Sequence, residues 1–170
     1  MNRSQNCLRV PQNVQVGQIE IDDMRYDILP VETTHFEDWL RLRKCVYNGV
    51  DDEFHQQEMA LILDDAEKEC LLAVLDGGAV FGMVEVSLRN VVDGCLTSPV
   101  GYIEGIFVDP AHRGLGVARV LLQRAEHWCR SHGCQEIATD AELDNKEAQR
   151  FHQNMGFVET YRIIEFRKSL

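Results

Sequence analysis

The sequence lacks several features that define well-known classes of protein. It has no run of about eighteen uncharged apolar residues, as a membrane-spanning helix needs, and no apolar signal core in roughly its first thirty residues. Its six cysteines include no C-x-x-C pair and no zinc-type spacing with histidine, so we expect free thiols in a reducing compartment. We therefore expect a cytoplasmic protein with no membrane partner and no metal.

Positive charge is also scarce. Lys and Arg total 17 against 28 Asp and Glu, which gives a net charge of −11. Nucleic-acid phosphates require a basic face, so we expect no nucleic-acid partner and favour a small cationic one. The acidic residues are densest in a segment offset by Lys68 alone, namely Asp51, Asp52, Glu53, Glu58, Asp64, Asp65, Glu67 and Glu69. This segment is either a solvated helix face or one wall of a site for a polycation.

Two familiar phosphate-binding loops are missing as well. The sequence has neither G-x-G-x-x-G with its following acidic residue nor G-x-x-x-x-G-K-[ST]. Residues 102–122 nevertheless run from a β-branched and aromatic strand, through Asp109-Pro110, into a glycine loop and an apolar helix. Consecutive amides at such a helix start can cradle a pyrophosphate. The alternative is a plain strand-to-helix turn that needs glycine.

The remaining pattern predicts one mixed α/β domain. A chain of 170 residues suits a single domain, which we place at 24–170, with residues 1–23 as a polar N-terminal arm. Periodicity predicts helices at 34–47, 53–66, 117–132 and 145–155, and strands at 24–29, 70–75, 79–88, 99–108 and 135–139, with a closing pair of strands over 157–166. This order of elements is hard to arrange as a doubly wound parallel sheet. A sheet with an antiparallel half joined to a short parallel half fits better.

Local signals refine these elements. A capping box is expected at Thr34 to Glu37, and Asp76-Gly-Gly78 predicts a hairpin. The second helix is expected to turn inward the side chains of Met59, Ile62 and Leu63.

Several of these segments resemble the GNAT superfamily of N-acetyltransferases. Arg113 to Ala118 reads R-x-x-G-x-A after a strand ending in Val-Asp-Pro, which is similar to that family's acetyl-CoA signature. The frame N-x-x-A-x-x-x-Y-x-x-x-G-F recurs at Asn145 to Phe157, with His152 in place of Tyr. With residues 39–43, 97–108 and 138–145, the likeness over 24–168 is closest to bacterial aminoglycoside 6'-N-acetyltransferases. It implies a mostly antiparallel sheet of six to seven strands, about four helices, and a homodimer.

The resemblance also implies acetyl-CoA as co-substrate. In the family the loop amides bind the pyrophosphate, and the preceding strand bonds the pantetheine arm. The residues carried over to this role are Ile106, Phe107, Val108, Arg113, Gly114, Leu115, Gly116, Val117, Ala118 and Asn145. For Asn145 a helix cap is the alternative, and the amide of Ile106 or Phe107 is the expected donor to the thioester oxygen.

Catalysis is assigned to Glu104, Asp140 and His152. A protonated amine must lose a proton before it attacks the thioester, and the resemblance places Glu104 and Asp140 against the substrate amines. Each residue also has a purely structural alternative. Glu104 could instead be paired with Arg41 or Arg43, and Asp140 could be a turn or helix-cap acid. His152 could form a contact between helix and sheet. Substrate binding is assigned to Glu104, Asp140 and two aromatics.

Those aromatics are Tyr47 and Tyr161, which stand where the family tends to have Trp and an acid. Val91 also departs from the pattern. The two tyrosines therefore either form a modified sugar pocket or are ordinary core or strand aromatics. Three functions remain open at this point. They are acetylation of an aminoglycoside 6'-amine by direct attack in a ternary complex, acetylation of another cation such as a polyamine, peptide or metabolite, and acyl-CoA binding without turnover.

Overall fold

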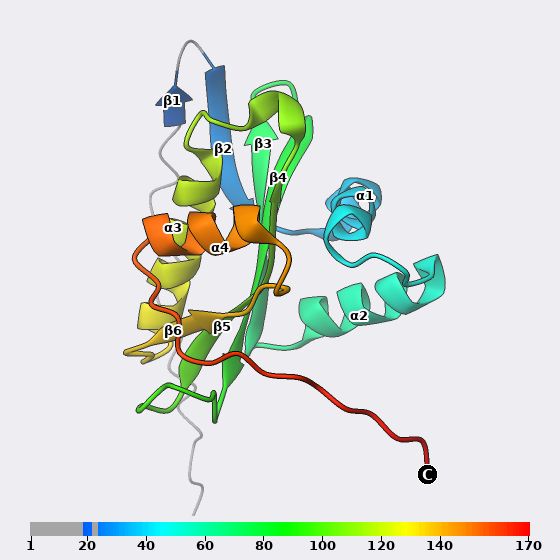
Figure 1. Ribbon diagram of the computed structural model, residues 1–170. Helices are drawn as coiled ribbons and strands as arrows, with labels where there is room; N and C mark the ends of the chain where they lie inside the picture. The colour runs from blue at the N-terminus through cyan, green and yellow to red at the C-terminus, as the bar shows by residue number, and fades with distance from the viewer. Residues whose placement is uncertain (1–18, 22–23) are drawn as a thin grey trace, which may run out of the picture.

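A computed structural model, which describes residues 19–21 and 24–170, contains one six-stranded sheet (Figure 1). Its strands are β1 (Ile19–Ile21), β2 (Met24–Pro30), β3 (Lys68–Leu75), β4 (Val80–Arg89), β5 (Val100–Val108) and β6 (Ile137–Thr139). They lie in chain order, and every neighbouring pair is antiparallel except β5 and β6. The mixed, mostly antiparallel sheet is therefore confirmed. Of the expected arm, residues 1–18 and 22–23 lie outside the described part, and the rest forms β1.

Helices cover both faces of this sheet. The structure contains α1 (Phe36–Val46), α2 (Asp52–Asp64), α3 (Val117–Ser131) and α4 (Lys146–Asn154), with single turns η1 (Thr33–His35) and η2 (Pro110–His112). In Figure 1, α1 and α2 lie on one side of the sheet, and α3 and α4 lie on the other. No helix in the described ranges combines the length and apolarity needed to cross a bilayer.

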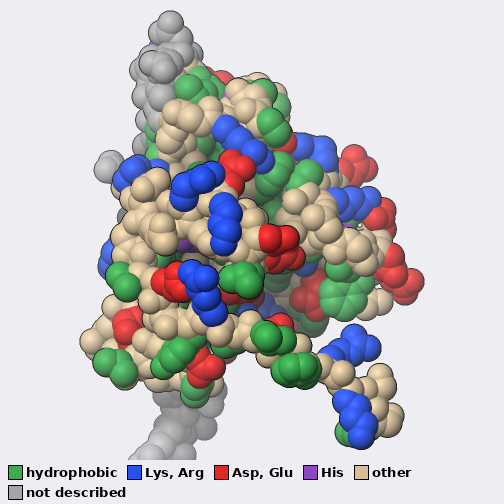
Figure 2. Space-filling model, in the orientation of Figure 1, with side chains coloured by type: hydrophobic (Ala, Val, Ile, Leu, Met, Phe, Trp, Pro, Cys, Tyr) green, Lys and Arg blue, Asp and Glu red, His purple; other side chains and the backbone are tan. Residues whose placement is uncertain are grey.

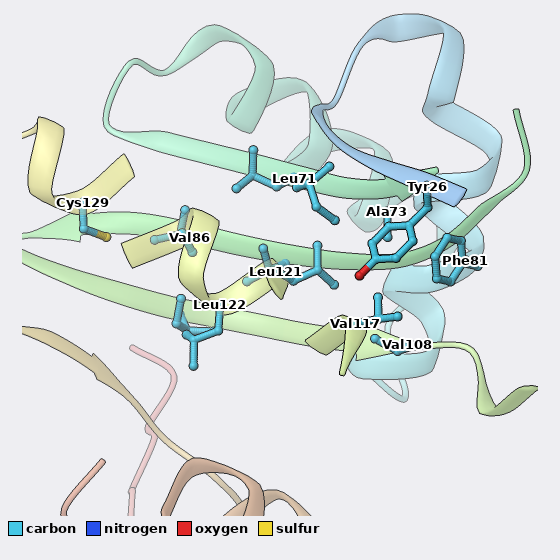
Figure 3. Close-up of a cluster of buried hydrophobic side chains, with 14 of the residues drawn as sticks. Tyr26, Leu71, Ala73, Phe81, Val86, Val108, Val117, Leu121, Leu122 and Cys129 are labelled. Carbon is cyan, nitrogen blue, oxygen red and sulfur yellow. The ribbon is translucent and has the colours of Figure 1, made fainter. Parts of the chain in front are cut away.

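Two hydrophobic clusters hold the layers together. Figure 3 shows the one under α3, where Val117, Leu121 and Leu122 meet the sheet beside Tyr26 and Phe81. The other cluster packs Trp39 of α1 and Met59 of α2 against the opposite face. Each fully buried aliphatic side chain contributes about 1.5–3 kcal/mol, so the two clusters fix the sheet between its helices.

Two local predictions about the helices were wrong. The capping box forms two residues earlier, between Glu32 and His35, so Thr34 lies inside η1 and α1 begins at Phe36. Leu63 does not point inward, because it is 39% exposed at the end of α2. The hairpin at 76–78 is confirmed, with Gly78 in the left-handed conformation at φ 83°.

The predicted closing strands over 157–166 were also wrong. The chain after Gly156 has no regular secondary structure and leaves the body of the domain as a tail (Figure 1). Its exposed large apolar residues are Val158, Tyr161, Ile163, Ile164, Phe166 and Leu170. Strand-forming side chains do not suffice for a strand, because its backbone groups must also pair with a neighbouring edge.

Candidate active site

Strands β5 and β6 stop pairing about halfway along β5. Their parallel ladder ends at the pair Ile103 and Thr139, whereas β5 continues to Val108. The amide of Asp109 donates to Phe81 of β4, so strand alternation turns the amides of Ile106 and Val108 toward the edge that β6 has left. Of the two expected donors to the thioester oxygen, the alternation favours Ile106 over Phe107.

A β-bulge in β5 lies at the end of this ladder. Glu85 of β4 pairs with Gly105, and Val86 pairs with Ile103, so Glu104 between them has no partner residue. Bulges of this kind redirect a side chain. Here the bulge turns Glu104 into a cleft that α1 and α2 form with the sheet.

Glu104 is held by two neighbours on β4. Ser87 donates its hydroxyl to Oε1, and Arg89 donates through Nε at 3.2 Å and through Nη2 to Oε2 at 2.7 Å. The alternative pairing with Arg41 or Arg43 was wrong, because those residues bind Asp109 and Glu85 instead. The Glu104 side chain is 34% exposed and lines the cleft.

Asp140 directly follows β6 and is tied back to β5. It accepts a 2.8 Å hydrogen bond from the hydroxyl of Tyr102. Burial and this bond to a carboxylate both raise the pKa of Tyr102, so the phenol stays protonated and continues to donate. The guanidinium of Arg89 lies 3.4 Å above the centre of the Tyr102 ring, which links the two acids through one pair of side chains.

His152 lies on α4 near Asp140. Its ring meets Phe151 and Phe157 edge-on, and its Nδ1 is buried without a hydrogen-bond partner among the described residues. Burial lowers the pKa of His152, opposed by the charge of Asp140, so the ring is neutral at physiological pH.

The predicted phosphate loop connects η2 to α3. Gly114 and Gly116 both have left-handed φ, at 78° and 79°, and nothing lies within 4 Å of where their Cβ atoms would be. The left-handed backbone favours glycine at both positions, and the open space beside them leaves room for a ligand to approach the main chain. Arg113 braces the loop, because its Nε donates to the carbonyl of Val108 at 3.0 Å.

The other residues of the predicted cofactor set lie around this loop. Val117 and Val108 are buried in the α3 cluster, against which Ile106, Leu115 and Ala118 also pack, and Phe107 packs on the α1 side. Asn145 is the N-cap of α4, where its side chain accepts from the amide of Ala148 at 3.0 Å. The structure thus shows the capping role of Asn145.

The cleft beside Glu104 has a volume of about 320 Å³. Its lining residues are Arg43, Tyr47, Val50, Phe54, His55, Glu58, Ile62, Lys68, Glu85, Val86, Ser87 and Glu104. The predicted residue Tyr47 is among them, and Tyr161 is not, since it lies on the tail and is 64% exposed.

Sequence reasoning missed the buried acid at the floor of this cleft. Glu85 is 2% exposed and accepts three hydrogen bonds, from Trp39 at 2.6 Å, Arg43 at 2.7 Å and Tyr47 at 2.8 Å. The available signal was a lone acidic residue within the otherwise apolar run Phe81 to Val86. The pKa of Tyr47 is raised by burial and by Glu85, so Tyr47 is a fixed donor to this acid.

The acidic segment 51–69 contributes little to the cleft. Of its eight acids only Glu58 lines it, whereas Asp52 pairs with Lys44, and Asp65 with Lys68. Acidic side chains appear on the outer surface over α1 and α2 in Figure 2. Asp52, Glu53 and Asp64 are exposed on α2, so the helical part of the segment is mainly a solvated face.

Within the described ranges the side chains form no metal site. No three His, Cys, Asp or Glu residues there gather closely enough to hold an ion. The five cysteines in this part of the chain are free.

Comparison with known proteins agrees with this geometry. The model of the acetyltransferase (GNAT) family matches residues 33–157. The chain is 41% identical over 145 residues to the aminoglycoside N(6')-acetyltransferase type 1 of Acinetobacter genomosp. 13, covering 85% of this chain and 99% of the relative. The type 1 enzyme of Acinetobacter baumannii is 39% identical over 145 residues, with the same coverage.

Solved structures give the same answer. The aminoglycoside 6'-N-acetyltransferase AAC(6')-IG of Acinetobacter haemolyticus superposes with a TM-score of 0.80 at 40% identity, covering 84% of this chain and 98% of that one. A structure of AAC(6')-Iy with the bisubstrate analog CoA-S-monomethyl-acetylneamine has a TM-score of 0.81 at 38% identity, covering 85% and 99%.

Proposed function

This chain belongs to the GNAT family of acetyltransferases, and we propose that it transfers an acetyl group from acetyl-CoA to the 6'-amine of an aminoglycoside. The relatives named for that reaction are matched by this chain over nearly their whole length. The observation that carries the proposal is the position of Glu104 and Asp140 at the end of the β5–β6 ladder, joined through Arg89 and Tyr102.

In this proposal the backbone of the glycine loop and of β5 binds the cofactor. The left-handed glycines at 114 and 116 and the start of α3 bind the pyrophosphate, because free amides and the helix dipole favour negative charge. The β5 edge that β6 leaves binds the pantetheine arm and leads the thioester toward Glu104. The amide of Ile106 stabilises the negative charge that grows on the thioester oxygen.

The acids prepare the amine. An aliphatic ammonium with a pKa of about 10.4 must lose its proton before it attacks. Glu104 and Asp140 hold the ammonium and relay that proton through water, and the amine then attacks the thioester carbon directly in a ternary complex. The leaving thiolate, with a pKa of about 8.5, needs little help, and His152 is the group placed to return a proton.

We further propose that the protein is a cytoplasmic homodimer in which 24–170 is the transferase domain. Acetyl-CoA as co-substrate supports the location. The exposed apolar tail after Gly156 supports the dimer, because a second copy would cover it. Analytical ultracentrifugation at micromolar concentration tests this, and a monomer there contradicts it. Tyr161 on that tail stays a prediction.

The function is tested by thiol release from acetyl-CoA with kanamycin, spermidine and a lysine peptide as acceptors. Activity confined to sugars with a 6'-amine supports the proposal, and activity on spermidine or the peptide alone points to another cation. Cofactor binding without release on any amine would leave an acyl-CoA-binding module.

Two variants test the assigned acids. Glu104→Gln and Asp140→Asn should each lower turnover at least tenfold, about 1.4 kcal/mol of transition-state stabilisation, with acetyl-CoA binding retained. Glu126→Gln on α3, which removes a helix-surface pair with Arg130, is the matched control. Unchanged turnover in both site variants contradicts the assignment.

A further inference from the structure

Arg89 occupies the space between the two proposed substrate-binding acids. Its guanidinium bonds Glu104 through two nitrogens and lies 3.4 Å from the centre of the Tyr102 ring, whose hydroxyl donates to Asp140. Tyr102 is only 8% exposed, whereas the Arg89 side chain is 41% exposed. The arginine thus joins the acids and covers an aromatic ring while remaining open to solvent itself.

These contacts are the ones an ammonium group seeks. A cation gains from a carboxylate in hydrogen-bond contact and from an aromatic face within about 6 Å of the ring centre. Arg89 makes both contacts at once. An amine that arrives at Glu104 must therefore compete with a cation that belongs to the protein.

We propose that Arg89 is a specificity-determining residue, an internal cation that an amine substrate displaces from Glu104. This inference rests on the function proposed above. It implies that the enzyme prefers acceptors with several positive charges. A substrate with one positive charge can only replace the contacts that Arg89 already makes with Glu104 and Tyr102, so it gains little from displacing Arg89. A substrate with several charges also gains from Asp140 and from the acidic surface of a chain with net charge −11, and so repays the displacement.

The competing explanation is that Arg89 only braces the sheet. Arg89 is the last residue of β4 and pairs with Val100 through its backbone, which a side-chain substitution leaves in place. A bracing side chain affects stability and leaves the apparent affinity for amines unchanged or weaker. An internal competitor has the opposite effect, because its removal strengthens amine binding.

The test compares Arg89→Gln with the unaltered protein in steady-state acetylation. The acceptors are kanamycin, which carries several ammonium groups, and 6-amino-6-deoxyglucose, a single ring with one. We expect Arg89→Gln to lower KM for kanamycin at least about threefold, and to raise kcat/KM more for the monoamine, so that the preference for the polycation narrows. KM should also rise more steeply with salt in the variant, since one more unpaired acid attracts the substrate.

Two further variants keep the result interpretable. Arg89→Lys retains the charge but loses the two-nitrogen contact, so its KM should fall less than that of Arg89→Gln. Arg130→Gln removes an exposed arginine of α3 that pairs with Glu126, and it should leave KM and kcat/KM for both acceptors unchanged. If Arg89→Gln fails to fold, Arg89→Lys carries the test, and an unchanged or higher KM in it overturns the proposal.

Failure of the function itself gives a different result. If the unaltered protein acetylates no amine, the proposed function is wrong. If it acetylates kanamycin while folded Arg89→Gln keeps or raises KM, only the role of Arg89 is wrong. Calorimetric titration of kanamycin into each protein with CoA present measures the same affinity without turnover.

Discussion

Tyr102 donates a 2.8 Å hydrogen bond to Asp140 across the last paired residues of β5 and β6. Tyr102 is paired with Ala138 in the ladder, whereas Asp140 is the first residue beyond β6. This bond is what fixes an otherwise exposed carboxylate at the point where the two strands separate.

Loss of this bond should weaken the site without affecting the cofactor. We expect Tyr102→Phe to reduce kcat/KM for the amine about two- to tenfold, the equivalent of one hydrogen bond, because Asp140 then samples other rotamers. The KM for acetyl-CoA should stay the same. A matched control is Tyr26→Phe in the core cluster under α3, because it removes a buried hydroxyl that has no hydrogen-bond partner among the described residues. An equal loss in both variants contradicts the role of Tyr102.

The buried acid Glu85 should be a determinant of stability. Glu85→Gln leaves the charge of Arg43 unpaired where the side chain is only 6% exposed. We expect the free energy of unfolding in urea to fall by at least about 2 kcal/mol. Glu126→Gln removes a carboxylate from a helix-surface pair and should cost about 0.5 kcal/mol or less. Equal losses for the two variants contradict the role of Glu85.

The left-handed glycines offer a test of the cofactor loop. Gly116→Ala forces a side chain onto a backbone at φ 79°, which costs about 1–2 kcal/mol, and it tilts the amides at the start of α3. We expect weaker binding of CoA by calorimetry. Gly78→Ala has the same conformation, φ 83°, in the β3–β4 turn, so it should cost similar stability and leave CoA affinity unchanged. Equal CoA affinity in both variants contradicts the loop assignment.

Stability should depend on pH through His152. Because burial lowers its pKa in the folded protein, the unfolded chain binds more protons once the pH falls below about 6.5. The free energy of unfolding should therefore decrease from pH 7 to pH 5, and less steeply in His152→Gln. Part of this pH dependence should persist in His152→Gln, because burial also lowers the pKa of His55.

The control for this pH effect is His127→Gln, which alters an exposed histidine of α3 and should keep the full slope. Denaturant titrations at several pH values measure all three proteins. An identical slope in His152→Gln and the unaltered chain contradicts the burial argument.

The sequence alone determined the local elements of this protein. The strand, glycine loop and helix over 102–122, the hairpin at 76–78 and the helix that ends before Gly156 all follow from patterns within a few residues. Such patterns are sufficient because helix periodicity, turn chemistry and glycine conformations are set by near neighbours in the chain. They also located Glu104 on a central strand and Asp140 at the end of the next one.

Only the tertiary structure decided which side chains meet. Arg89 reaches Glu104 because of the β4–β5 register and its bulge, and Glu85 gathers Trp39, Arg43 and Tyr47 from a helix packed on the sheet. The tail after Gly156 carries strand-forming residues, yet it forms no strand, because it pairs with no sheet edge in the part of the chain that the structure describes. Partner choice depends on long-range register and packing, which a single sequence does not reveal.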